Sequence, residues 1–170
     1  MALGAAMATG KPQAMAVVPG PGFLNAASAL ATAYSNNARV FAVVGQIPLH
    51  SIGRLTGQLH EVVRQTEIVQ TMVKWHHLAK GTADVPGAVA GGFRQLLSGR
   101  PRPVAVEVPM DVWQRPAAMV AQQAAVAPLP PPVDEDAAEQ AARLLGGAER
   151  PMIVVGSGAL DAGPEVKALA

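Results

Sequence analysis

The chain has 170 residues, half of them hydrophobic and 15% charged, with 17 glycines, 15 prolines and no cysteine. This composition argues against a globally disordered chain, and the lack of cysteine excludes disulfides, thiolate catalysis and Cys-based zinc sites, as expected of a cytoplasmic protein. A net charge of +1 and the lack of a basic run leave no electrostatic basis for nucleic acid or an anionic membrane as a partner.

The first half of the chain predicts a strand, a helix and a second strand. Met1–Gly10 is apolar but short, without a basic start, and predicts the end of a helix stopped by Gly10 rather than a signal peptide or membrane span. Gln13–Val18 and Arg39–Val44 are continuous apolar runs typical of buried strands, and Phe23–Tyr34 between them has helical spacing. This order predicts a βαβ unit with a parallel sheet.

The middle of the chain continues the same alternation. Gln46–Gly57 has no clean period and predicts a loop over the carboxyl ends of the strands. Leu59–Val73 predicts a segment that is at least partly helical, and Val85–Leu97 predicts a helix with one apolar face. Val104–Val108 then predicts another buried strand.

The composition changes after this strand. Ala117–Pro132 is rich in Ala, Gln and Pro and predicts an extended linker. Asp134–Leu145 predicts a helix with an acidic start, and Met152–Val155 predicts a buried strand that leads into Gly156-Ser157-Gly158. We therefore divide the chain into a first domain at 1–115, a linker at 116–132 and the start of a second α/β domain at 133–170.

The segment Pro19–Gly22, here called the Pro/Gly corner, joins the first strand to the first helix, where α/β proteins commonly place a ligand. A phosphate cradle needs backbone N–H groups, and Pro19 and Pro21 have none. The corner is better suited to holding a flat polar ring, with the amide of Asn25 beside it. The alternative is a plain tight turn in which Asn25 helps the helix to start.

Other chemical signals are weak. Gly156-Ser157-Gly158 is only part of a dinucleotide-binding loop, and an ordinary βα turn is the alternative. His76 and His77 are adjacent and would point to opposite faces if they lay on a strand, so we expect no metal site there. Glu61, Glu67 and Glu107 are isolated carboxylates for which we expect solvated surface or helix-face positions.

An ordered set of short motifs covers roughly residues 1–113. The motifs are Ala8–Pro12, Gly20–Asn25, Ala31–Tyr34, Val44–Pro48, Lys74-Trp75, Ser98–Pro101 and Val108–Val112. In this order they resemble the N-terminal, pyrimidine-binding domain of the thiamine-diphosphate enzymes of the acetolactate synthase and pyruvate oxidase group. The resemblance implies an α/β fold: a three-layer parallel sheet with helices on both faces, followed by a linker and the start of a second, Rossmann-like α/β domain.

The resemblance also implies cofactor-binding residues. By analogy with the family, the aminopyrimidine of thiamine diphosphate lies against Gly20, Pro21, Gly22 and Asn25. Gln58 matches the glutamine of the family pattern Gly-Thr-Asp-Ala-Phe-Gln-Glu, but Arg54–Gly57 and Leu59 depart from it. This departure weakens the case for a biosynthetic acetolactate synthase and leaves room for a related 2-oxo-acid lyase or decarboxylase.

The remaining family features are expected outside this chain. The family's catalytic glutamate precedes the helix that ends at Gly10, and no glutamate occurs before Glu61. The diphosphate and its Mg²⁺ are held in the family by a C-terminal domain, and FAD is bound in some members by the central domain. We therefore expect a piece truncated at both ends that is inactive alone, of an enzyme that acts as a homo-oligomer on a 2-oxo acid.

Two alternatives stay open. In the first, the chain is a non-enzymatic module that docks on a full-length homologue. In the second, it is a small nucleotide-binding α/β protein that uses the Gly156-Ser157-Gly158 loop.

Overall fold

The computed structural model describes the whole chain except residues 119–120, 123–125, 127 and 130. The chain divides into two compact units, Met1–Pro128 and Leu129–Ala170, each of which is described by itself. The expected linker at 116–132 contains all seven of the residues outside the description, and its boundaries stay a prediction.

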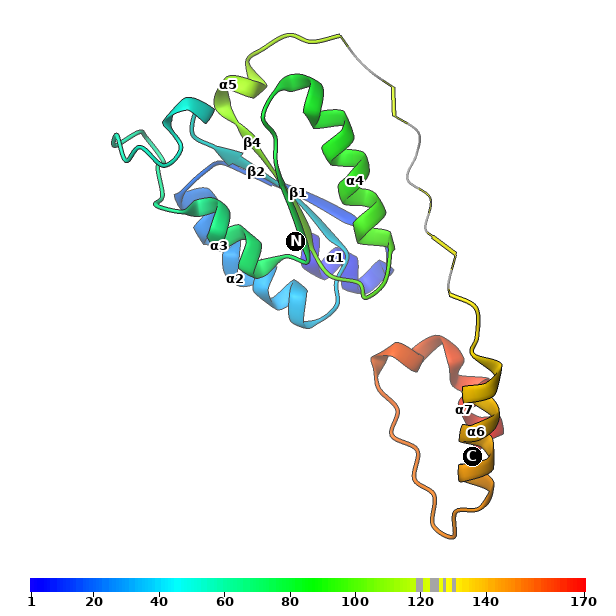
Figure 1. Ribbon diagram of the computed structural model, residues 1–170. Helices are drawn as coiled ribbons and strands as arrows, with labels where there is room; N and C mark the ends of the chain where they lie inside the picture. The colour runs from blue at the N-terminus through cyan, green and yellow to red at the C-terminus, as the bar shows by residue number, and fades with distance from the viewer. Residues whose placement is uncertain (119–120, 123–125, 127, 130) are drawn as a thin grey trace. The chain divides into compact units, whose positions relative to one another are not determined.

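The N-terminal unit is built on a parallel sheet of four strands in the order β1-β2-β4-β3 (Figure 1). The strands are β1 (Gln13–Val17), β2 (Val40–Gln46), β3 (Trp75–Leu78) and β4 (Val104–Pro109). The predicted strands at 13–18, 39–44 and 104–108 are confirmed as strands, as is the parallel βαβ unit. The expectation that the first of them is buried is wrong, since Ala14 and Ala16 are exposed on β1 at the edge of the sheet. The strand β3 was not predicted because its four residues include two histidines and form no apolar run.

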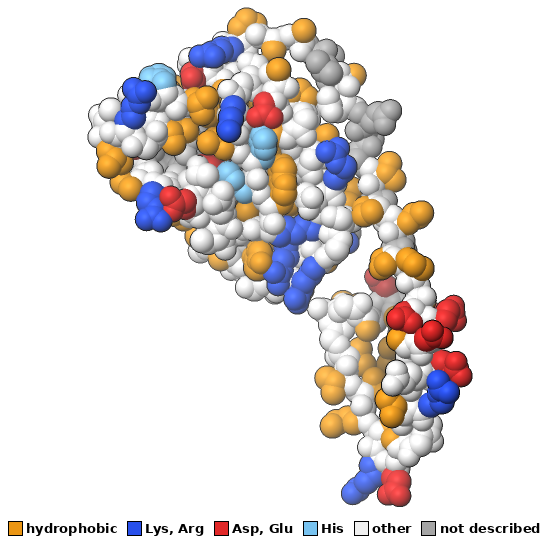
Figure 2. Space-filling view, in the orientation of Figure 1, with side chains coloured by type: hydrophobic (Ala, Val, Ile, Leu, Met, Phe, Trp, Pro, Cys, Tyr) orange, Lys and Arg blue, Asp and Glu red, His pale blue; other side chains and the backbone are white. Residues whose placement is uncertain are grey.

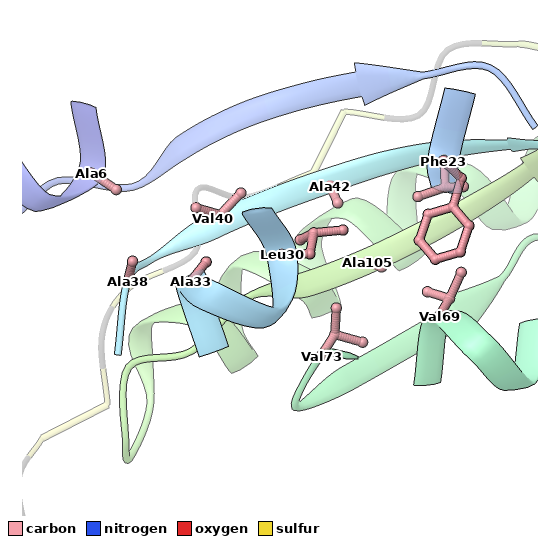
Figure 3. Close-up of a cluster of buried hydrophobic side chains, with 11 residues drawn as sticks. Ala6, Phe23, Leu30, Ala33, Ala38, Val40, Ala42, Val69, Val73 and Ala105 are labelled. Atoms are coloured by element: carbon pink, nitrogen blue, oxygen red, sulfur yellow. The ribbon is translucent and has the colours of Figure 1, made fainter. Parts of the chain in front are cut away.

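Helices cover both faces of the sheet, which confirms the three-layer α/β architecture. On one face lie α1 (Ala2–Thr9), α2 (Pro21–Ser35) and α3 (Gln65–Met72). On the other lie α4 (Val85–Leu97) and α5 (Met110–Trp113). Figure 3 shows the apolar cluster of the first face, in which Phe23, Leu30 and Val69 point toward the sheet.

The central strands are buried because helices pack on both of their sides. Along β2, Ala42 and Val44 join the cluster beneath α2, while Phe41 joins the cluster beneath α4. Each large apolar side chain buried in this way contributes about 1.5–3 kcal/mol. The continuous apolar run that predicted β2 is thus explained by a strand with neither face open to solvent.

The segment at 59–73 is helical only in its second half. Residues 57–64 are not helical and include turns at 59–60 and 63–64, with positive φ angles at His60 (68°) and Arg64 (60°), and α3 begins after them. The β-branched Val62 and Val63 in this stretch favour non-helical backbone. The loop at 46–57 contains the short 3₁₀ helix η1 (Leu49–Ser51), and η2 (Thr82–Asp84) leads into α4.

The C-terminal unit contains α6 (Glu135–Gly146), η3 (Ser157–Ala162) and α7 (Gly163–Leu169). The side chain of Asp134 caps α6 by accepting a hydrogen bond from the Ala137 N–H at 2.9 Å. No described helix in either unit is long and apolar enough to cross a membrane.

The predicted strand at Met152–Val155 is wrong, since this stretch forms no regular secondary structure. Met152 and Val154 are 83% and 88% exposed. A strand forms by hydrogen bonding to a neighbouring strand, and the described residues of this unit provide none. Gly156-Ser157-Gly158 therefore lacks the strand that a dinucleotide-binding loop requires in front of it.

Candidate functional site

The Pro/Gly corner lies at the carboxyl end of β1 and leads directly into α2. Gly20 has a φ of +57° and a ψ of −115°, a combination that only glycine adopts readily. A Cβ at Gly20 would lie 2.4 Å from the backbone oxygen of His60. The corner thus requires glycine here both for its backbone conformation and for its contact with the 57–60 turn.

Two further glycines allow neighbouring side chains to pack directly against the backbone at the corner. A Cβ at Gly22 would lie 2.4 Å from Val18 Cγ2, and a Cβ at Gly45 of β2 would lie 2.7 Å from Pro19 Cδ. Pro19 and Gly20 are both buried. The corner is therefore a tightly packed, rigid surface element rather than an open loop.

The backbone donors of the corner are already used. The Gly20 N–H donates to Gln65 Oε1 at 2.7 Å, the Gly22 N–H makes a long hydrogen bond to Pro19 O at 3.4 Å, and Pro19 and Pro21 have no N–H. Such a corner cannot point several amides at a phosphate. The exposed groups it does offer are the Pro21 ring and, one turn into α2, the Asn25 side chain.

The structure places four of the five expected site residues together: Gly20, Pro21, Gly22 and Asn25 all lie at the start of α2. Gln58 lies on the separate 57–64 segment, exposed, with its backbone N–H donating to Glu61 Oε2 at 3.0 Å. The residue of this segment that touches the corner is His60, through its backbone carbonyl. No feature of the sequence alone pointed to His60.

Beneath the corner lies a buried polar cluster of Gln46, Gln65, His76 and Glu107. Glu107 Oε1 accepts hydrogen bonds from Gln65 Nε2 at 2.8 Å and Gln46 Nε2 at 3.2 Å, and Glu107 Oε2 lies 2.8 Å from His76 Nε2. Gln65 Nε2 also donates to the Gly45 carbonyl at 3.0 Å. Gln65 thus connects the corner, β2 and the Glu107 carboxylate.

The expectation of a solvated Glu107 is wrong, since this side chain is 0% exposed. Glu107 is the one charged residue in the run Val104–Val108, and both faces of β4 are covered by helices. A charge within a strand that is buried on both faces must itself be buried and hydrogen-bonded. A single charged residue within a continuous apolar run was therefore the feature of the sequence that indicated the buried polar cluster.

His76 and His77 point to opposite faces of β3, as predicted. His76 reaches Glu107, while His77 Nε2 lies 2.8 Å from Asp84 Oδ2. Partial burial acts to raise the pKa of the Asp84 carboxyl, but hydrogen bonds from His77 and the Lys80 N–H, together with their charges, bring that pKa below its ordinary value. Within the described ranges, no three His, Asp or Glu side chains are placed to hold a metal ion.

Two cavities lie at the carboxyl end of the sheet, and Gln46 lines both. One, of about 340 Å³, is lined mainly by apolar groups, among them Val18, Pro19, Met110 and Trp113. The other, of about 350 Å³, lies at the start of α3 and is lined in part by Ile52, Glu61 and Gln65. A concave apolar surface with few polar groups beside a rigid corner is typical of a site for a flat organic ring.

Known proteins are similar to this chain in sequence. Residues 1–68 match the family model described as thiamine pyrophosphate enzyme, N-terminal TPP binding domain. The chain is 33% identical to acetolactate synthase 1, chloroplastic, of Oryza sativa subsp. japonica over 171 residues, 98% of this chain and 26% of that protein. It is 36% identical to the probable 2-ketoarginine decarboxylase AruI of Pseudomonas aeruginosa over 172 residues, 99% of this chain and 30% of that protein.

The fold is shared with a solved structure. Benzoylformate decarboxylase from Polynucleobacter necessarius superposes with a TM-score of 0.74 at 23% identity, covering 92% of this chain and 29% of that chain. The chain spans between a quarter and a third of the length of these relatives. The N-terminal part of the chain therefore carries the N-terminal TPP-binding domain of the thiamine pyrophosphate enzymes, of the kind found in acetolactate synthases and related decarboxylases.

Proposed function

We propose that the N-terminal unit binds the aminopyrimidine half of thiamine diphosphate against the Pro/Gly corner. The observation that carries this proposal is the corner's own hydrogen bonding. Its one strong amide donor is taken by Gln65, so the corner offers a ring surface at Pro21 and a side-chain amide at Asn25 instead of an anion cradle.

Each residue has a separate role in this proposal. Pro21 supports one face of the ring by shape, and Asn25 pairs with a ring nitrogen or the exocyclic amine. Gln58 approaches from the 57–64 segment, whose position is set where the His60 carbonyl meets Gly20. The cofactor, when bound, supplies an electron sink for breaking or making a bond next to the carbonyl carbon of a 2-oxo acid.

The wider activity is also a proposal. Relatives with this domain include acetolactate synthases and a probable 2-ketoarginine decarboxylase, so we infer 2-oxo-acid lyase or carboligase chemistry for a protein that contains this chain. The residues around Gln58 that depart from the family pattern favour a decarboxylase or lyase over a biosynthetic acetolactate synthase. We assign Mg²⁺ and the diphosphate to another part of such a protein, and FAD, where used, to the central domain whose start we expect at 133–170.

The binding proposal is tested by adding thiamine, which has the pyrimidine but no phosphate, to the ¹⁵N-labelled chain and following the amide signals by NMR. We expect saturable shifts at residues 20–25 and 57–65. Asn25→Ala is expected to weaken binding about tenfold, or about 1.4 kcal/mol. Asn36→Ala, at the far end of α2, is the matched control and leaves binding unchanged. Shifts elsewhere only, or equal weakening by both variants, would contradict the proposal.

The activity of the chain alone is tested with pyruvate, thiamine diphosphate and Mg²⁺. Because the chain spans about 26–30% of its curated relatives, we expect no release of CO₂ above the blank. The alternative of a module that docks on a longer homologue predicts that the two proteins purify together. Turnover by the chain alone would refute our expectation of inactivity.

A further inference from the structure

Four cations gather at the amino ends of the strands, the opposite end of the sheet from the Pro/Gly corner. Arg39 directly precedes β2, Lys74 directly precedes β3, and Arg100 and Arg102 lie just before β4. We call these four residues the basic cluster. Figure 2 shows Lys and Arg side chains gathered at the lower end of the N-terminal unit.

Lys74 lies within this cluster and is held by carbonyl groups. Its Nζ donates to Ser98 O at 2.7 Å and to Arg100 O at 3.0 Å. Partial burial, followed by the nearby charges of Arg39 and Arg102, lowers the pKa of the Lys74 ammonium. The charges of Arg39 and Arg102 therefore lie close enough to repel the Lys74 ammonium.

The guanidinium groups also reach only uncharged acceptors. Arg39 Nη1 donates to Gly10 O at 3.1 Å, and Arg100 Nε donates to Asn37 Oδ1 at 2.9 Å. Arg102 Nη1 donates to the Tyr34 hydroxyl, with its guanidinium carbon 3.9 Å from the centre of the Tyr34 ring. Among the described residues, none of the four cations forms an ion pair with a carboxylate.

This arrangement has a cost in free energy. Arg39, Lys74 and Arg102 are half-buried, and the Nε atoms of Arg39 and Arg102 are enclosed without an acceptor in the described part of the chain. Cations that lose part of their hydration without gaining a counter-charge destabilise the folded state. Elsewhere the chain pairs exposed arginines with carboxylates, as in Arg64 with Glu67 and Arg115 with Asp111.

We propose that the basic cluster binds a small polyanion through its phosphate or carboxylate oxygens. A guanidinium presents two parallel N–H groups that match these oxygens. Among the described residues, each guanidinium of the cluster uses only one of its five N–H donors. Exposed Arg100 beside half-buried Arg39, Lys74 and Arg102 gives the anion access from solvent. The bound anion would offset the repulsion of Lys74 by Arg39 and Arg102.

The proposal is tested on the full ¹⁵N-labelled chain at constant ionic strength, with inorganic pyrophosphate in one titration and citrate in another. We expect saturable NMR shifts at residues 37–39, 74 and 98–102. Tighter binding of pyrophosphate would assign a phosphate ligand, and tighter binding of citrate a carboxylate ligand. Neither probe resembles thiamine, so this outcome is separate from the test of the Pro/Gly corner.

The variants complete the test. Arg39→Gln and Arg102→Gln are each expected to weaken binding at least tenfold, whereas Arg54→Gln, an exposed arginine of the 53–57 loop, leaves binding unchanged. If loss of the Tyr34 contact unfolds Arg102→Gln, the exposed Arg100→Gln provides the second measurement and is expected to weaken binding as well. Absence of saturable shifts, or equal weakening by Arg54→Gln, would overturn the proposal.

Discussion

Glu107 is a carboxylate with no exposed surface that accepts hydrogen bonds from both Gln46 and Gln65 and lies within hydrogen-bonding distance of His76. Replacing it by Gln would turn an NH₂ group toward one of these donors. We expect Glu107→Gln to lower the free energy of unfolding by about 1–3 kcal/mol, and Glu107→Ala to lower it by about 3–5 kcal/mol because partners are left unpaired.

Urea unfolding measures these changes. Glu67→Gln is the matched control, because Glu67 is exposed and solvent screens its ion pair with Arg64. Since Gln65 joins Glu107 to Gly20, we also expect the Gly20 amide signal to move in Glu107→Gln. Equal losses of stability in the Glu107 and Glu67 variants would show that the buried cluster adds nothing beyond a surface ion pair.

Asp84 makes the free energy of unfolding depend on pH in the acid range. Its folded-state pKa lies below the unfolded value, so the folded state gains stability from the ionised carboxyl above the unfolded pKa. That gain is lost as the pH falls through the folded pKa. Unfolding free energies of the parent chain and of Asp84→Asn, measured from neutral pH into the acid range, should differ at neutral pH and converge at the acid end. A constant difference would contradict the assignment.

At the scale of elements, the junction of β1 and α2 depends on Gly20. Gly20 and Gly57 both have positive φ angles, +57° and +70°, but their surroundings differ. A Cβ added at Gly20 would lie 2.4 Å from the His60 oxygen, whereas one added at Gly57 would have nothing within 4 Å. We expect Gly57→Ala to cost about 1–2 kcal/mol for backbone conformation, and Gly20→Ala roughly twice that or more because the 57–60 turn must also move.

Thermal unfolding of the two variants checks this expectation, with amide signals of residues 60–65, beyond the immediate chain neighbours of Gly57, as a second readout. Displacement of these signals is expected in Gly20→Ala alone. Equal changes in both variants would mean that the contact with His60 does not hold the corner.

Sequence pattern predicted those elements whose periodicity is set by burial. Apolar runs predicted β1, β2 and β4, and helical spacing predicted α2 and α4, because each of these elements packs a continuous face against the core. The start of α3 and the strand β3 were missed. These two segments depend on hydrogen bonds of polar side chains, such as Gln65 and His76, to groups that are distant in the sequence.

The same distinction applies to the candidate site. The Pro/Gly corner could be predicted because the backbone conformations available to proline and glycine follow from the residue type alone. The pairing of Gly20 with Gln65, 45 residues away, and the contact with His60 are tertiary facts that no local pattern contains. The opposite error at Met152–Val155 has the same cause, since an apolar run becomes a strand only where a neighbour pairs with it.

For the whole molecule, hydrogen exchange should separate paired from unpaired backbone. β2 and β4 each have a hydrogen-bonded strand on both sides, so their amides should exchange most slowly. The amides of residues 152–155 have no strand partner among the described residues and should exchange almost as fast as in an unfolded peptide. Strong protection at 152–155 would show pairing there that this structure lacks.

The order of strands leaves β1 at the border of the sheet, bonded to β2 on one side only among the described residues. Its sequence, Gln-Ala-Met-Ala-Val, has neither the charge nor the proline with which proteins commonly discourage self-association at such a border. We expect the purified chain to aggregate as its concentration rises, and Ala14→Lys, at an exposed position, to reduce the aggregation without changing the unfolding midpoint. Light scattering over a concentration series measures this, and unchanged scattering in the variant would show that the strand is not the cause. β1, which leads into the Pro/Gly corner of the proposed ligand site, is then also the strand that limits the solubility of the protein.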